Sequence, residues 1–269
     1  MFGPLAAALV IVGLVVALLA PSHGGALDPV ARAADTTAAA GTAEFGMSGS
    51  ISVAGQSIPL NGSGAMDMNG GAARVKVSTT IPGAGAMEVE EIMSGTTLYM
   101  RFPSQLSQRL PGGKPWMKLD LQAFGKARGI DFKQLLQSNQ NNPADMLKAL
   151  KTVGSSRVVG HEDIGGAPTT HYQATIDLSK AADRIPDKQT VTALKQLFAQ
   201  AGVSSMPIDV WIDRVGRVRR ESLNMSTSEY SMQMTLEFTR FGVPVDITPP
   251  PADQVLDASS LLGAATSSG

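Results

Sequence analysis

Cysteine is absent from the 269-residue chain. Its absence excludes disulfide bonds, thiolate metal ligands, a cysteine nucleophile and a lipidated N-terminal cysteine. A large excess of charges of one sign is also absent. The chain has 22 lysines and arginines and 23 aspartates and glutamates, for a net charge of -1 at pH 7. Such a chain has no broad electrostatic field that would attract a nucleic acid or an anionic membrane surface. We therefore expect no nucleic-acid partner.

Histidine is scarce, which limits the catalytic chemistry available to the chain. The three histidines are His23, His161 and His171, and no G-x-S-x-G motif accompanies them. We expect His161 and His171 on facing strands of a hairpin, as a solvated or hydrogen-bonded pair, and a zinc ion would need two further ligands that nothing nearby suggests. We therefore predict no catalytic residue, no metal site and no cofactor, and we expect that the chain is not an enzyme.

Acidic residues gather at two places on predicted strands. One group consists of Glu88, Glu90 and Glu91, and in the other Asp209 and Asp213 flank Trp211. Catalysis by a pair of carboxylates requires that the two groups be held about 5 to 10 Å apart in a cleft. The simpler interpretation, which we adopt, is that both groups face solvent.

The N-terminal segment predicts export. Leu5 to Ala20 is an unbroken apolar run closed by Pro21, with a length between that of a signal peptide and that of a membrane span. We assign residues 1–26 to a signal peptide or membrane anchor and residues 27–43, which are rich in alanine, to a linker. If the segment is not cleaved, it would associate the protein with the membrane. The expected location is the outer face of the cytoplasmic membrane or the medium.

Residues 44–249 read as one domain dominated by antiparallel strands. Apolar residues alternate with polar ones from Glu44 to Phe102 and again in the last block, from Ile208 to Phe238. Asn69-Gly70 predicts a two-residue hairpin turn with positive φ at both positions, and Ser94-Gly95 and Gly165-Gly166 predict further turns.

The spacing of apolar residues changes from that of a strand to that of a helix at three places. Two short helices are expected after Asp131 and after Asn142-Pro143, and a longer helix is expected over residues 187–201. The predicted fold is α+β, with a large curved antiparallel sheet and helices that cover its concave apolar face. We expect residues 250–269 to form a covering segment that ends in a disordered tail.

Two C-terminal segments, Pro207 to Arg219 and Phe241 to Asp253, together with the order of strands and helices, resemble the LppX/LprG-type mycobacterial lipoproteins. The resemblance extends over roughly residues 45–262. It implies a fold like that of the lipoprotein carrier LolA, a half-barrel closed by helices that holds acylated lipids or glycolipids in the space between sheet and helices. The chain departs from that family because it has no lipobox cysteine, so the usual acyl anchor cannot form.

Methionine is abundant, with 13 residues against three tyrosines and two tryptophans. A flexible and polarisable side chain adapts to ligands of variable shape, although an ordinary core that uses methionine in place of leucine would have the same composition. In the light of the resemblance we predict a lipid-binding cavity lined by Met66, Met68, Met87, Val89, Leu98, Met100, Leu135, Met146, Leu150, Val191, Leu194, Phe198, Val210, Met232, Met234 and Leu236.

Within this cavity, the helical face formed by Val191, Leu194 and Phe198 is expected to close over Met100 and Met234. The predicted function is non-catalytic binding or transport of an acylated lipid or glycolipid in the cell envelope, with an envelope transport protein as a further partner. The alternative is an envelope sensor or scaffold of the same fold that binds a protein partner. An empty space between sheet and helices would favour the first function, and a packed one the second.

Overall fold

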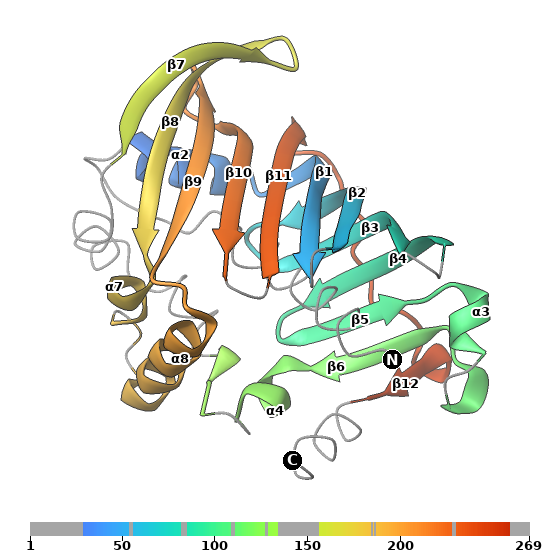
Figure 1. Ribbon diagram of the computed structural model, residues 1–269. Helices are drawn as coiled ribbons and strands as arrows, with labels where there is room; N and C mark the ends of the chain where they lie inside the picture. Colours follow the sequence, from blue (N-terminus) through green and yellow to red (C-terminus); the bar gives the residue numbers. More distant parts are fainter. Residues whose placement is uncertain are drawn as a thin grey trace.

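The computed structural model describes residues 29–53, 56–81, 85–108, 111–126, 129–133, 156–183, 185, 187–227 and 230–258. Within these ranges twelve strands form one sheet in the order β12-β6-β5-β4-β3-β2-β1-β11-β10-β9-β8-β7. Each neighbouring pair is antiparallel except β12 and β6, which are parallel. The sheet is open and strongly curled, so that β7 to β10 stand upright while β4 to β6 run across the lower part of the molecule (Figure 1).

One arm of the sheet follows the chain from β1 through β6. Its strands are β1 (Thr42–Val53), β2 (Gln56–Asp67), β3 (Ala72–Ile81), β4 (Gly85–Ser94), β5 (Thr97–Arg101) and β6 (Trp116–Asp120). The turn at Asn69-Gly70 is present between β2 and β3, but its predicted conformation is wrong. Positive φ belongs to Gly71, and the Asp67 carboxylate accepts the backbone N–H groups of Asn69 and Gly70. An Asx turn therefore replaces the expected two-residue hairpin.

The other arm contains the C-terminal strands. They are β7 (Arg157–Ile164), β8 (Ala167–Asp177), β9 (Ser205–Asp213), β10 (Val218–Ser226) and β11 (Tyr230–Phe241), and β11 pairs with β1 to join the arms. The predicted turn between β7 and β8 is confirmed, since Gly165 and Gly166 both have positive φ there. The remaining strand, β12 (Val255–Asp257), extends the first arm.

The helices are few and short within the described ranges. They are α2 (Pro29–Ala38), α3 (Ser104–Ser107), α4 (Leu121–Lys126), α7 (Leu178–Ala182) and α8 (Lys188–Ala201), with 3-10 turns η1 (Pro111–Gly113) and η2 (Ala252–Gln254). Helix α8 occurs where it was predicted, with Asp187 accepting the Thr190 N–H at its start and left-handed Gly202 at its end. The two helices predicted after Asp131 and Asn142 lie largely outside the described residues. None of the described helices combines the length and apolar character that crossing a bilayer requires.

The two faces of the sheet differ in character. One face, which we call the apolar face, carries a single cluster of buried aliphatic, methionine and phenylalanine side chains from both arms. Helices α2 and α4 add Ala33 and Leu121 to this cluster. The other, polar face is crossed by the segment that follows β11, where Arg74 donates a hydrogen bond to the Thr248 carbonyl and β12 then pairs with β6. The predicted α+β class, with a large antiparallel sheet, is confirmed.

The segment assigned to a linker, residues 27–43, is not one. Helix α2 occupies most of it and packs against β9 and β10, and β1 begins at Thr42 (Figure 1). Ala33, Thr37 and Ala38 are almost fully buried. Small side chains allow this close packing while contributing little hydrophobicity, so the segment resembles a flexible linker in composition alone. Residues 259–269 of the predicted tail lie outside the described residues.

Candidate functional site

Most of the predicted cavity residues lie together on the apolar face. Nine of them are buried in its cluster, namely Met66, Met68, Val89, Leu98, Met100, Val210, Met232, Met234 and Leu236, and half-buried Met87 packs against the same cluster. Strand pairing explains how distant segments meet, since Met234 lies beside Leu223 on one side and Gly49 on the other. Leu135, Met146 and Leu150 lie outside the described residues.

Glycines in β1 and β2 make room for large side chains of this face. A side chain at Gly64 would lie within 2.7 Å of the Phe45 ring, and one at Gly62 would lie 3.3 Å from the Met47 methyl group. Phe45 in turn lies 6.3 Å, between ring centroids, from Phe238. Phe45, Met47 and Phe238 are therefore residues of the apolar face that the sequence analysis missed, although the alternation of β1 and β11 could have indicated them.

The helical face expected to close the cavity is elsewhere. Val191, Leu194 and Phe198 of α8 are half-buried and lie outside the apolar cluster. Helix α8 packs against α7, beyond the ends of β8 and β9 (Figure 1). The expectation that this helix lies over Met100 and Met234 is therefore wrong, because its position depends on the β8–α7 connection, which the helical pattern does not specify.

A buried carboxyl group interrupts the apolar face. Glu91 is 2% exposed. It lies two residues from both Val89 and Met93 along β4, so its side chain points to the same face as theirs. Burial raises the pKa of Glu91 to about 8. The prediction that this acidic group faces solvent is correct for Glu88 and wrong for Glu91, while Glu90, on the polar face, lies between Arg74 and Arg101.

A second acidic residue of this face, Glu221, did not enter the sequence analysis. It lies on β10 between Val210 and Leu236, two buried residues of the apolar cluster. Burial among them raises the pKa of Glu221 to about 8, although its side chain is only half-buried from solvent. Both carboxyl groups are therefore mostly neutral at pH 7.

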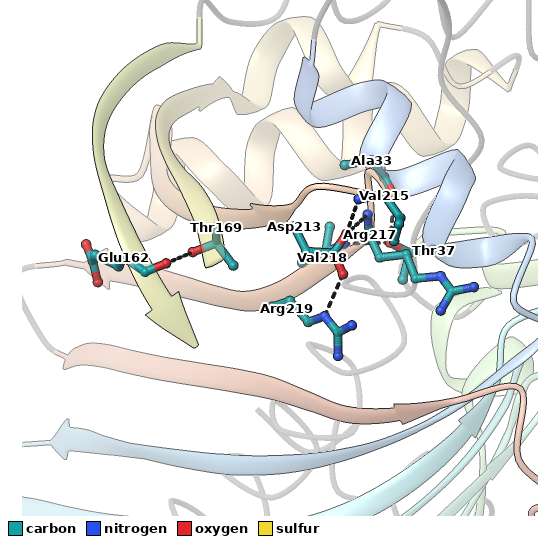
Figure 2. A network of polar contacts seen from close by, with 9 residues as sticks. All are labelled: Ala33, Thr37, Glu162, Thr169, Asp213, Val215, Arg217, Val218 and Arg219. Carbon is teal, nitrogen blue, oxygen red and sulfur yellow. Dashed lines mark hydrogen bonds and ion pairs between the residues drawn. The ribbon is translucent and has the colours of Figure 1, made fainter. Parts of the chain in front are cut away.

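Asp213 of the other predicted solvent-facing pair is buried as well, in a fully bonded network beside α2 (Figure 2). Its carboxylate accepts the N–H groups of Val215 and Arg217 and the Nε–H of Arg219 at 3.1, 2.9 and 2.7 Å. The Thr37 hydroxyl joins the same turn by accepting the Val218 N–H at 2.9 Å. This network holds the β9–β10 turn against the helix and corrects the prediction that Asp213 faces solvent.

Asp209, the other member of that pair, holds a histidine instead of facing solvent freely. The His171 ring lies between Asp209 Oδ1 at 2.8 Å and Glu162 Oε1 at 3.2 Å, and it stacks on Trp211 with 4.1 Å between ring centroids. His161 contacts the Thr170 hydroxyl at 3.3 Å. The histidines lie on facing strands as predicted but do not pair with each other, and His171 ties β7, β8 and β9 together on the polar face.

A separate depression of about 420 Å³ lies where β2, β3 and β4 end. It is lined by Pro59, Asn61, Ser78, Thr79, Thr80, Ala86, Met87 and Glu88. Most of these residues alternate with members of the apolar cluster, so the depression opens mainly on the polar face. Of the predicted cavity residues, the depression shares only Met87.

Comparison with known proteins finds sequence relatives in Streptomyces. The chain is 30% identical over 156 residues to an uncharacterised 31.2 kDa protein of Streptomyces griseus, with a match that spans 56% of this chain and half the length of that relative. It is also 23% identical over 252 residues to a predicted lipoprotein of Streptomyces coelicolor. This match covers 89% of this chain and 77% of that relative. No family model matches the chain.

Among solved structures, the chain is similar to the lipoprotein LppX of Mycobacterium tuberculosis, with a TM-score of 0.46 and 14% identity over 82% of this chain and 96% of LppX. The resemblance to lipoproteins found in the sequence agrees with the relative from Streptomyces coelicolor, which is a predicted lipoprotein.

Proposed function

We propose that the chain is an exported, non-catalytic protein of the cell envelope that binds acylated lipids or glycolipids against its apolar face and transports them. The observation that carries the proposal is the apolar face itself, which is continuous from β6 to β9 and rich in methionine. Flexible methionine side chains can repack around acyl chains of different length. Each methylene group that such a face removes from water contributes about 0.8 kcal/mol.

Three further observations support this function. Most of the described residues predicted to line a cavity lie on this one face. The neutral carboxyl groups of Glu91 and Glu221 keep charge away from it at pH 7. The relative from Streptomyces coelicolor is a predicted lipoprotein, which supports a location in the cell envelope.

The test is lipid uptake by the full-length protein. A fluorescently labelled diacylglycerol is offered in vesicles, and native mass spectrometry identifies any lipid that the protein already carries. Met87→Trp, at the half-buried border of the apolar face, is expected to obstruct lipid and lower uptake. Glu88→Trp, on the next residue but the opposite, exposed face, is the matched control and is expected to leave uptake unchanged. A protein that carries no lipid and takes up none would contradict the proposal.

A second candidate, binding of a protein partner, is favoured by the edge strand β7. Val158 and Val159 are 55% and 40% exposed on that strand, which pairs only with β8 in the described sheet. Exposed apolar residues on an unpaired edge favour addition of a partner strand. Under this function, replacing both valines with lysine would abolish capture of an envelope protein by crosslinking and leave lipid uptake unchanged.

A further inference from the structure

Among the described residues with ionisable side chains, Glu91 is the most deeply buried, and its surroundings are apolar. Its neighbours across the strands are Val75 on β3 and Met100 on β5, and its neighbours along β4 on the same face are Val89 and Met93. All four side chains belong to the buried cluster. The carboxyl group therefore lies within the surface to which we assign the acyl chains.

Neither oxygen of Glu91 has a hydrogen-bond partner among the described residues. Buried polar groups are nearly always hydrogen-bonded, because desolvation without a partner is costly. The contrast with the adjacent residue is direct, since Glu90 points to the polar face and lies 3.5 Å from both Arg74 and Arg101. An unsatisfied carboxyl group in the middle of an apolar face is what a site for the polar part of an otherwise apolar ligand requires.

The protonation state selects the kind of ligand group. Burial raises the pKa of Glu91 to about 8, so the side chain is mostly a neutral acid at pH 7, with one O–H donor. A neutral donor favours an uncharged acceptor over a carboxylate or phosphate, which would also have to be desolvated. In an acylated lipid the ester carbonyl oxygen is such an acceptor, and it is attached directly to the acyl chain.

We propose that Glu91 is the polar anchor of the apolar face, where its carboxyl group donates a hydrogen bond to an ester carbonyl oxygen of the bound lipid. This inference rests on the proposed function, which it makes more specific. The anchor sets how far the acyl chain extends along the face, because the carbonyl is held at β4 while the chain covers the methionine-rich surface around it. Ester-linked lipids are the favoured ligands over their ether-linked counterparts, which lack the carbonyl.

The experiment compares two probes that differ only in this group, dioleoylglycerol and the corresponding dioleylglycerol diether. Each displaces a fluorescent lipid from the full-length protein at pH 7. The wild-type protein is expected to bind the ester about 3- to 10-fold more tightly than the ether, the value of one net hydrogen bond. Glu91→Leu is expected to lose that preference and keep its affinity for the ether. Glu91→Gln, whose amide group also donates, is expected to retain the preference.

Glu221→Leu is the matched control, because it removes a carboxyl group with a similarly raised pKa from the same face at a half-buried position. It is expected to leave the ester preference unchanged. A thermal melt verifies folding, and Glu91→Leu should melt no lower than the wild type because it removes an unsatisfied polar group.

The outcomes separate the two proposals. If the wild-type protein binds neither probe, the proposed lipid-binding function fails and the anchor fails with it. If it binds both probes without preference, or if Glu91→Leu keeps the preference, the anchor is overturned while lipid binding stands. If Glu221→Leu loses the preference instead, the anchoring group is Glu221 and the assignment to Glu91 is wrong.

Discussion

Asp213 and Glu91 are both buried acidic residues on strands, yet their surroundings are opposite. Asp213, 8% exposed, accepts three hydrogen bonds from the β9–β10 turn and from Arg219 (Figure 2). Glu91, 2% exposed, is surrounded by apolar side chains and accepts none from the described part of the chain. Full satisfaction at one site indicates a structural role, whereas the unused bonding capacity at the other is what the proposed ligand would satisfy. Opposite responses to substitution follow from this difference.

The largest effect is expected at Asp213. Asp213→Ala removes one partner of a buried ion pair and leaves the N–H groups of Val215 and Arg217 without their acceptor, at a cost of about 3 kcal/mol. The melting temperature should fall by about 6 to 12 °C. Asp213→Asn, which keeps an acceptor oxygen for the backbone and loses the charge, should lie between the wild type and the alanine variant. Equal melting temperatures for all three would show that the network does not stabilise the fold.

The next effect is a pH dependence that comes from the apolar face. Burial raises the pKa of Glu91 and of Glu221 from the ordinary value of 4.5 to about 8 in the folded protein. Between pH 4.5 and 8 the folded state therefore retains protons that the unfolded chain releases, and the free energy of unfolding falls as the pH rises through this window. The cross-strand neighbours of both residues, Val75 and Met100 for Glu91 and Val210 and Leu236 for Glu221, carry no charge.

We expect the melting temperature to fall by on the order of 5 °C or more between pH 5 and pH 9. Differential scanning calorimetry of the wild type and of the double variant Glu91→Gln with Glu221→Gln measures the share that these groups contribute. The double variant should show a flatter dependence over the same range. An unchanged slope would mean that both carboxyl groups ionise as they do in water.

Replacing Glu91 alone is expected to stabilise the fold, whereas replacing Asp213 destabilises it, and the change at Glu91 is the smaller of the two. Glu91→Leu substitutes an apolar side chain of similar size, so it removes a desolvated carboxyl group without opening a large cavity. The free energy of unfolding at pH 7 should rise by about 1 to 2 kcal/mol, which corresponds to a few degrees in melting temperature. A fall in stability would indicate that Glu91 has a structural partner and would weaken its assignment as a ligand anchor.

The alternation of apolar and polar residues predicts most of the fold, because side chains of a strand necessarily point to opposite faces. It places Met66, Met100 and Met234 on one face without any knowledge of strand order. The same rule would have placed Glu91 on the same face as Val89 and Met93. The sequence analysis placed it in solvent instead, because an acidic residue is most often exposed. The burial of Asp213 depends on α2, a segment 175 residues or more earlier in the chain, which no local pattern brings next to it.

Long-range packing also explains two further wrong predictions, the linker and the position of α8. Helix α2 reads as a linker because its buried residues are alanine and threonine, whose contribution to hydrophobicity is small. Helix α8 is correctly bounded because its caps are local features, but its position relative to the sheet is determined by its packing on α7. Local signals therefore specify elements and faces, while the satisfaction of each buried polar group depends on contacts that are distant in sequence.

The smallest effect tests whether the network around Asp213 extends into α2. Thr37 and Thr36 are adjacent, and each hydroxyl donates to a carbonyl four residues earlier, Thr37 to Ala33 at 2.6 Å and Thr36 to Arg32 at 2.9 Å. Only Thr37 also accepts a backbone N–H from the sheet, that of Val218. Thr37→Val keeps the shape of the side chain and deprives this buried N–H of its acceptor, so it should cost about 1 kcal/mol.

Thr36→Val is the matched control, since it makes the same chemical change where the hydroxyl bonds within the helix alone. It should alter the free energy of unfolding by less than about 0.5 kcal/mol. Urea denaturation of both variants, with and without Asp213→Ala, completes the measurement. If Thr37 and Asp213 act as one network, the double variant will lose less stability than the sum of the two single losses, because the turn is already released from α2 once Asp213 is gone. Strict additivity would show instead that the helix and the carboxylate hold the turn independently.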